Sequence, residues 1–130
     1  MAEHPNVGLL RKVYEAFAKG DIATLTEMFA ENVVWHIPGS NRWSGEHRGR
    51  DAVFAMFAGI AELSGGTYRV ELHDALANDE HAVALSRATA GRQGKQIDLR
   101  NVNVYHVENG KIMEAWVFAE DQRLIEEFWS

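Results

Sequence analysis

The sequence predicts one α+β domain over residues 1–130, shaped as a cone in which three N-terminal helices pack on a strongly curved mixed or antiparallel sheet and enclose a pocket. In the first half, apolar residues recur at three- and four-residue spacing, which is typical of helices. In the second half they alternate with polar residues, and glycine or asparagine turns separate the segments. Helices laid on one face of a bent sheet leave a hollow at its open end.

The helical half divides into three amphipathic segments. Gly20 ends the first, and Asp21 can cap the second by accepting its free amide hydrogens. Asn32 is expected to end the second helix, and Gly65 follows the third. The apolar stripes are Val7, Leu10, Tyr14 and Phe17 in the first, Ile22, Leu25, Met28 and Phe29 in the second, and Val53, Phe57 and Ile60 in the third.

The remaining segments are predicted to be strands. They comprise residues 33–37, 68–73, 81–90, 96–107 and 111–119. Pro38 ends the first, and Asn109-Gly110 is a strong hairpin signal because both residues tolerate positive φ. A short final helix is expected to carry Phe128 and Trp129.

Composition excludes several classes of function. The formal net charge is −6 and no dense Lys/Arg cluster occurs, so a nucleic-acid partner is not expected. The chain has no cysteine, and its histidines lack metal-ligand spacing, so we expect no disulfide, thiol nucleophile or metal. It has no phosphate loop or dinucleotide fingerprint, so no cofactor is expected. Without an apolar run of bilayer length or a cleavable leader, we expect a cytoplasmic protein with no membrane partner.

His36 is the first candidate for chemistry, because an imidazole can take and return a proton near neutral pH. On a strand, Val34 and His36 point one way and Trp35 the other. If the first pair faces the cone, both line the pocket. The alternative is a hydrogen-bonded structural histidine that anchors the loop after Pro38.

Asp121 is the second candidate. It follows a strand whose small apolar alternation suits a pocket wall, formed by Met113, Ala115, Val117 and Ala119. Extending that alternation places Asp121 at the rim of the same face. The alternative, which does not exclude the first, is an N-cap for the final helix.

Polar residues in alternation on the long strand suggest a role inside the cone. Asn101, Asn103 and Tyr105 share one face, although asparagine is disfavoured in strands. Asn103 could donate a hydrogen bond to a carbonyl or enolate oxygen; the alternative is an internal network filled by water. Asp98 and Arg100 fall on the other face, where a surface pair is expected. An epoxide-hydrolase set with Asp121 is therefore disfavoured.

Several large aromatic residues are also candidates for an interface or for contacts with a ligand. Trp116 and Phe118 are predicted to project from the convex face of the sheet, where they would form a homodimer interface or be covered by the tail of the chain. Trp43 is placed at the pocket mouth as a ligand contact, or packs the loop, and Trp129 is expected to pack the last helix.

Several short motifs add a family resemblance. They are Phe17–Asp21, Trp35–Ser40, Arg48–Val53, Asn109–Ile112, Asp121–Gln122 and Phe128–Trp129. In this order they resemble the SnoaL-like and ketosteroid isomerase-like members of the nuclear transport factor 2-like superfamily. The resemblance covers nearly the whole chain and implies the cone-shaped fold, a small-molecule pocket and a homodimer.

The same resemblance locates family catalytic positions. His36 takes the place of the isomerase carboxylate base, Val13 that of its tyrosine and Asn103 that of its acid, so steroid isomerase activity is not expected. Tyr14, one residue along the helix from Val13, is turned by about 100° and is kept only as a ligand contact. In SnoaL-type cyclases an acid after the last strand transfers the proton, and Asp121 matches it.

Three functions therefore stand as hypotheses. The first is a cofactor-independent isomerase or cyclase that acts on a small, mostly apolar, carbonyl-bearing molecule through His36, Asp121 and Asn103. The second is a protein that binds such a molecule without turnover. The third is a dimerisation module whose cone is filled by its own side chains.

Overall fold

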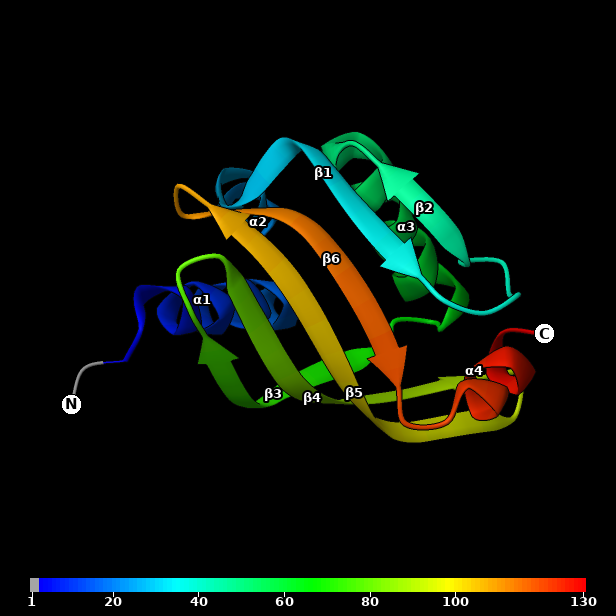
Figure 1. Cartoon of the computed structure of the whole chain (residues 1–130). Helices are drawn as coiled ribbons and strands as arrows, with labels where there is room; N and C mark the ends of the chain where they lie inside the picture. Colours follow the sequence, from blue (N-terminus) through cyan, green and yellow to red (C-terminus); the bar gives the residue numbers. More distant parts are fainter. Residues whose placement is uncertain (1–2) are drawn as a thin grey trace.

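The secondary structure follows the predicted order with one addition, a short strand over Gly45–Arg48 where the sequence predicts none. The computed structural model describes residues 3–130 (Figure 1). Within this range the chain forms four helices and one six-stranded mixed sheet, which confirms the α+β prediction. The elements are α1 (Pro5–Lys19), α2 (Ile22–Met28), β1 (Phe29–Ile37), β2 (Gly45–Arg48), α3 (Arg50–Leu63), β3 (Arg69–Ala77), β4 (His81–Arg92), β5 (Lys95–Glu108), β6 (Lys111–Ala119) and α4 (Gln122–Trp129). Met1 and Ala2, which belong to the predicted 1–130 domain, lie outside the described residues.

The sheet is open, and its order places the first strand, β1, beside the last strand, β6. The strands lie in the order β2-β1-β6-β5-β4-β3. β1 runs parallel to β6, and the other neighbouring pairs are antiparallel. Figure 1 shows α1 and α3 behind the sheet, against β3 and β1 respectively. We call this helix-covered side the inner face and the opposite side the outer face.

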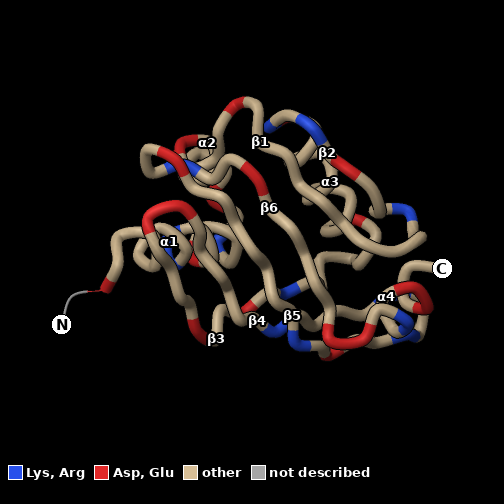
Figure 2. The backbone as a smooth tube through the Cα atoms, viewed as in Figure 1, with Lys and Arg blue, Asp and Glu red and all other residues tan. Residues whose placement is uncertain are grey.

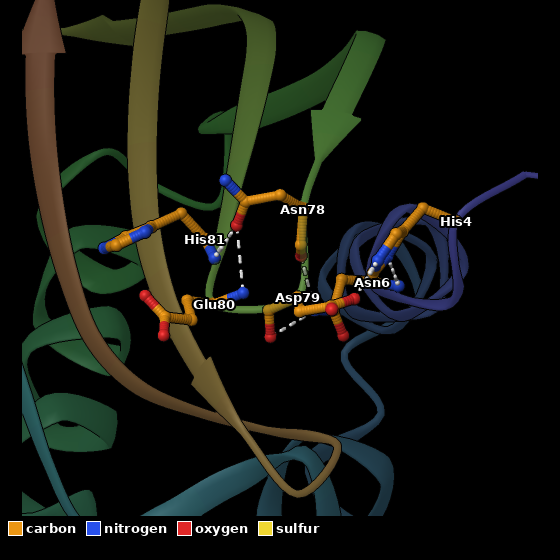
Figure 3. A network of polar contacts seen from close by, with 6 residues as sticks. All are labelled: His4, Asn6, Asn78, Asp79, Glu80 and His81. Carbon is orange, nitrogen blue, oxygen red and sulfur yellow. Dashed lines mark hydrogen bonds and ion pairs between the residues drawn. The ribbon is translucent and has the colours of Figure 1, made fainter.

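The start of α1 is tied to the turn between β3 and β4 (Figure 3). His4 caps the helix, because its Nδ1 accepts a hydrogen bond from the Asn6 amide at 3.1 Å. An imidazole nitrogen that accepts carries no proton, so the proton lies on Nε2, which donates to Asp79 Oδ1 at 2.8 Å. The Asn6 side chain donates to the Asn78 carbonyl at 3.0 Å. One imidazole thus joins a helix end to a hairpin turn.

The second helix is shorter than the sequence suggested. It begins after the Asp21 cap, as predicted, but ends at Met28, and β1 begins at Phe29 rather than at Val33. Phe29 is fully buried among aromatic rings, including Trp35 at a centroid distance of 5.7 Å. Burying such a ring contributes about 2–3 kcal/mol, which outweighs the small gain from one more helical turn.

The inner face packs into two apolar clusters. The larger one lies under α1, α2 and α3 and includes Leu10, Val13, Phe29, Trp35, Val53, Tyr105, Ile112 and Ala115. The smaller one lies under α4, at the far ends of β4 and β5, and consists of Ala90, Ile97, Leu99, Phe128 and Trp129. The strand positions between the clusters carry small or polar side chains, and they form the candidate site.

The outer face carries an apolar band across five strands. Strand register places Leu76, Val83, Val104, Trp116 and His36 in one row, and Leu85, Val102 and Phe118 in the next. Phe118 and Leu76 are 53% and 55% exposed. No Lys, Arg, Asp or Glu lies between Arg100 and Glu108 on β5 or after Glu114 on β6, and Figure 2 shows these stretches in tan. The prediction that Trp116 and Phe118 face away from the helices is confirmed.

Candidate functional site

The candidate site is a layer of polar side chains on the inner face, between the two apolar clusters. We call it the polar layer, and it consists of Tyr14, Ser86, Asn101, Asn103 and Tyr105. The β4–β5 register sets Ser86 opposite Asn101 and the small residue Ala84 opposite Asn103. Tyr14 enters from α1, which packs against β3 and β4. The layer therefore combines one helix with the two longest strands.

A hydrogen-bonded tyrosine pair forms the centre of the polar layer. The hydroxyl oxygens of Tyr14 and Tyr105 are 2.7 Å apart, and Asn103 Nδ2 donates to them at 3.2 and 3.1 Å respectively. Burial raises the pKa of Tyr105 to about 12 and also raises the pKa of Tyr14. Both hydroxyls therefore stay protonated at neutral pH and can act as hydrogen-bond donors.

Three buried polar atoms of the layer have no hydrogen-bond partner among the described residues. They are Ser86 Oγ, Asn101 Oδ1 and Asn103 Oδ1. Ser86 is only 4% exposed, so bulk water does not solvate it. A buried polar atom left unpaired costs about 1–3 kcal/mol. In a native fold a buried polar atom of this kind is paired either with a water molecule or with a ligand.

Small side chains of β6 form the wall beside these atoms. Ala119, Val117 and Ala115 lie opposite Asn101, Asn103 and Tyr105, so their predicted inward orientation is confirmed. Met113 was expected on the same wall. The register shifts between β5 and β6 at this point, and the fully buried Ile112 takes the inner position, opposite Val107. Met113 is the extra residue at this bulge, so the alternation on which its prediction depended does not assign it to a face, and its role as a ligand contact stays a prediction.

His36 and Val34 lie on the outer face, so the prediction that they line the pocket is wrong. The His36 ring stacks on Trp116 with centroids 5.4 Å apart, and its Nε2 lies 2.5 Å from Glu114 Oε2. Val34 pairs in register with Glu114 on that face. Trp35 takes the inner position because its large ring fills the aromatic core, in contact with Phe29, Phe57 and Tyr105. A proton-transfer role for His36 inside the cone loses its geometric basis.

Asp121 caps α4, as its structural alternative predicted. Its Oδ1 accepts from the amides of Arg123 and Leu124 at 3.1 and 3.4 Å. Oδ2 lies 3.9 Å from the Arg123 guanidinium, and the side chain is 37% exposed. Oδ1 therefore accepts hydrogen bonds from the first turn of α4, and Oδ2 is left accessible beyond the end of β6.

Trp43 lies where the two apolar clusters meet. Its ring is 5.5 Å from that of Trp129 in an edge-on arrangement, and both clusters contact it. Its Nε1 is buried without a hydrogen-bond partner in the described chain. This position fits either the pocket mouth or the packed loop, the two roles that the sequence left open.

The sequence missed one member of the polar layer, Ser86, and predicted another, Tyr14, only as a ligand contact. Ser86 lies in a run that alternates with inward alanines, at Ala82, Ala84, Ala88 and Ala90, and a polar residue at an inward position was the available signal. Tyr14 was expected to turn away from the family tyrosine position, yet its hydroxyl reaches Asn103. Its place beside Asn103 and Tyr105 agrees with a ligand contact, and whether it can take the role of the family tyrosine stays open.

The outer face also has polar features that do not form the expected site. Asp98 forms a two-point ion pair with Arg87, at 2.7 and 2.6 Å, rather than with Arg100. These side chains border a hollow of about 930 Å³ on β3, β4 and β5, whose lining also includes Ser86 and Asn101 of the polar layer. Within residues 3–130, no group of three or more histidine, aspartate or glutamate side chains could hold a metal ion. No helix in that range is long and apolar enough to cross a membrane.

A curved sheet with helices on one face and polar groups between two apolar clusters defines a class of small α+β proteins. Comparison with known proteins names the family. The chain belongs to the SnoaL-like domain family, whose model matches residues 10–115. It is 36% identical over 131 residues to an uncharacterised protein of Mycobacterium tuberculosis strain H37Rv, with 100% of both chains covered.

Solved structures agree with this assignment. Bal32a, from a soil-derived mobile gene cassette, is 37% identical with a TM-score of 0.94, covering 97% of each chain. More distant structures share the fold alone. TerC, co-crystallised with polyporic acid, is 19% identical with a TM-score of 0.84, covering 96% of this chain and 98% of its own. IdmH, a proposed polyketide cyclase from Streptomyces antibioticus, is 18% identical with a TM-score of 0.75, covering 95% and 96%.

Proposed function

We propose that the chain binds a small, mainly apolar, oxygen-bearing molecule in the polar layer. The observation that carries this proposal is the set of three unpaired polar atoms, Ser86 Oγ, Asn101 Oδ1 and Asn103 Oδ1, buried between two apolar clusters. Binding sites for small molecules are mostly apolar with a few placed polar groups. Membership of the SnoaL-like family and fold-mates such as TerC support the same function.

Binding in the interior can be separated from binding elsewhere by a matched pair of substitutions. Val117 faces the polar layer opposite Asn103, whereas Val102 lies on the outer face opposite Phe118. We expect 4-hydroxyacetophenone to bind the wild-type chain in isothermal titration calorimetry. Val117→Phe should abolish this binding by filling the layer, and Val102→Phe should leave it unchanged. Equal loss in both variants, or in neither, would refute the interior site.

Proton transfer by Asp121 is the second part of the proposal. The observation that favours it is Asp121 Oδ2 at the end of β6, which accepts no backbone amide and lies 3.9 Å from Arg123, because the strand residues that form the layer supply no carboxylate or imidazole. Asp121 lies four residues beyond Val117, the partner of Asn103, which is about 13 Å along the strand. The carboxylate therefore takes a proton from a carbon conjugated with a carbonyl rather than next to it, and the Tyr14–Tyr105 pair donates a hydrogen bond to the dienolate oxygen that forms. Asp121 then returns a proton to carbon, which completes an isomerase- or cyclase-type step.

Isotope exchange tests this chemistry without knowledge of the natural substrate. In D₂O, the wild-type chain should accelerate the exchange of the methyl protons of 3-methylcyclohex-2-enone, a methyl group conjugated with the carbonyl but remote from it, followed by NMR. Asp121→Asn keeps a good helix cap but removes the base, so exchange should fall by about a hundredfold while folding survives. Exchange at the uncatalysed rate with wild-type protein would leave the alternative, binding without turnover.

We further propose that two copies associate through the apolar band of the outer face. Phe118 is 53% exposed beside Val102, which is 38% exposed, and continuous apolar surfaces of this kind usually mark interfaces. Analytical ultracentrifugation should show a dimer, and Phe118→Asp should give a monomer. Leu124→Asp, an equally drastic change on exposed α4, serves as the control and should stay dimeric. A wild-type monomer would exclude the interface.

A further inference from the structure

The hydrogen atoms of the polar layer can be counted. Asn103 Nδ2 has two hydrogens, and both are donated, one to Tyr14 and one to Tyr105. The two tyrosine hydroxyls supply two more. One of these lies in the 2.7 Å contact between the hydroxyl oxygens, so the other remains available. The tyrosine pair therefore offers one donor to a guest.

The unpaired acceptors outnumber this donor. Asn101 Oδ1 and Asn103 Oδ1 accept nothing within the described residues, and Ser86 Oγ can both accept and donate. A ligand that pairs with the layer must bring a hydrogen to at least one of the amide oxygens and present an oxygen to the tyrosine pair. Asn101 and Asn103 are two residues apart on β5, so their side chains are separated by about 7 Å along the strand.

The layer is also without compensating positive charge. The inner-face positions of β4, β5 and β6 near it are alanine, serine, leucine, asparagine, tyrosine and valine. A carboxylate placed there would face two carbonyl oxygens and no cation. Burying an uncompensated charge costs several kcal/mol, so an anionic guest is disfavoured.

We propose that the layer selects a neutral molecule carrying a carbonyl and, some 7 Å away, a hydroxyl group. The tyrosine pair donates to the carbonyl, and Asn101 Oδ1 accepts from the hydroxyl. This inference rests on the proposed interior binding and adds the chemical class of the ligand. It makes Asn101 a specificity-determining residue.

Three matched compounds test the inference. 4-Hydroxyacetophenone has both groups, 4-methoxyacetophenone lacks the hydroxyl hydrogen, and 4-hydroxybenzoate is an anion. By calorimetry at neutral pH, the methoxy compound should bind about tenfold more weakly than the hydroxy compound, because one buried acceptor stays unpaired. The benzoate should bind more weakly than either ketone. These ratios are measured on the wild-type chain and need no variant.

The Asn101→Leu variant tests whether Asn101 causes the preference for the hydroxy over the methoxy compound. It removes the acceptor, so the hydroxy-to-methoxy ratio should fall from about tenfold to near one. Val102→Leu, the adjacent outer-face position, should keep the wild-type ratio. Equal affinity of both ketones for the wild-type chain, or tighter binding of the benzoate, overturns this inference while interior binding stands. Failure of all three compounds to bind overturns the proposed function and this inference with it.

Discussion

Alkaline pH should destabilise this protein through its buried tyrosines. The chain has three tyrosines, and burial raises the pKa of each: that of Tyr105 to about 12, that of Tyr68 to about 12, and that of Tyr14 well above its ordinary value of 10.0. In the unfolded chain all three titrate near 10. The folded state therefore binds more protons than the unfolded state in the range between these values.

The sign and size of the effect follow from linkage. A folded pKa above the unfolded one contributes stability that is complete below pH 10 and is lost as pH rises through about 12. Tyr105 is fully buried, so its shift of about two pKa units corresponds to about 3 kcal/mol. That is a large part of the stability of a domain of this size.

Two measurements check this expectation. Tyrosinate absorbance of the folded chain should rise above pH 11 and not near pH 10. Urea unfolding at successive pH values should show the free energy of unfolding falling from pH 10 upward. The Tyr105→Phe variant lacks one of the tyrosines with a raised pKa, so its free energy of unfolding should fall less steeply over the same pH range. Its free energy of unfolding below pH 10 should be lower than that of the wild type, because Tyr14 and Asn103 lose a hydrogen-bond partner. Tyrosines that titrate near pH 10 with constant stability would refute the reasoning.

Two further predictions concern helix ends and packing. His4→Ala should lower the free energy of unfolding by about 1 kcal/mol, because it removes the cap of α1 and the link to Asp79, and urea unfolding measures this; an unchanged midpoint would mean that the cap contributes nothing. Gly59→Ala should lower the melting temperature and shift tryptophan fluorescence, since its Cβ would lie 2.7 Å from the Trp43 ring. Gly8→Ala, in open space on α1, should raise the melting temperature, and a rise in both variants would contradict the packing argument.

Local signals carried most of the fold. The helix caps at Asp21 and Asp121, the left-handed end of α1 at Gly20 and the Asn109-Gly110 turn are all where the sequence predicts them. Each depends on chemistry within a few residues, so it can be recognised without knowing the partner. The early end of α2 depends on burial of Phe29 in the aromatic core, and such a tertiary effect overrides local propensity.

The main ambiguity in predicting the site was which face of each strand points toward the interior. Alternation groups Val34 with His36 and separates them from Trp35, but it does not say which group faces inward. The size of Trp35 decides, because only the interior provides contacts for its whole ring. On β5 the same rule gave the right answer, since Asn101, Asn103 and Tyr105 were grouped correctly and their polar character marked the interior site.

The parallel pairing of β1 with β6 has a consequence for the synthesis of the chain. β1 is made early, yet its partner in the middle of the sheet is the last strand to be made. Until then β1 and β2 form only a two-stranded hairpin, which is marginal alone and has an unpaired edge. Translation must therefore be nearly complete before all six strands of the sheet can pair. A chain that ends before β6 lacks a central strand of the sheet and not a dispensable terminal segment.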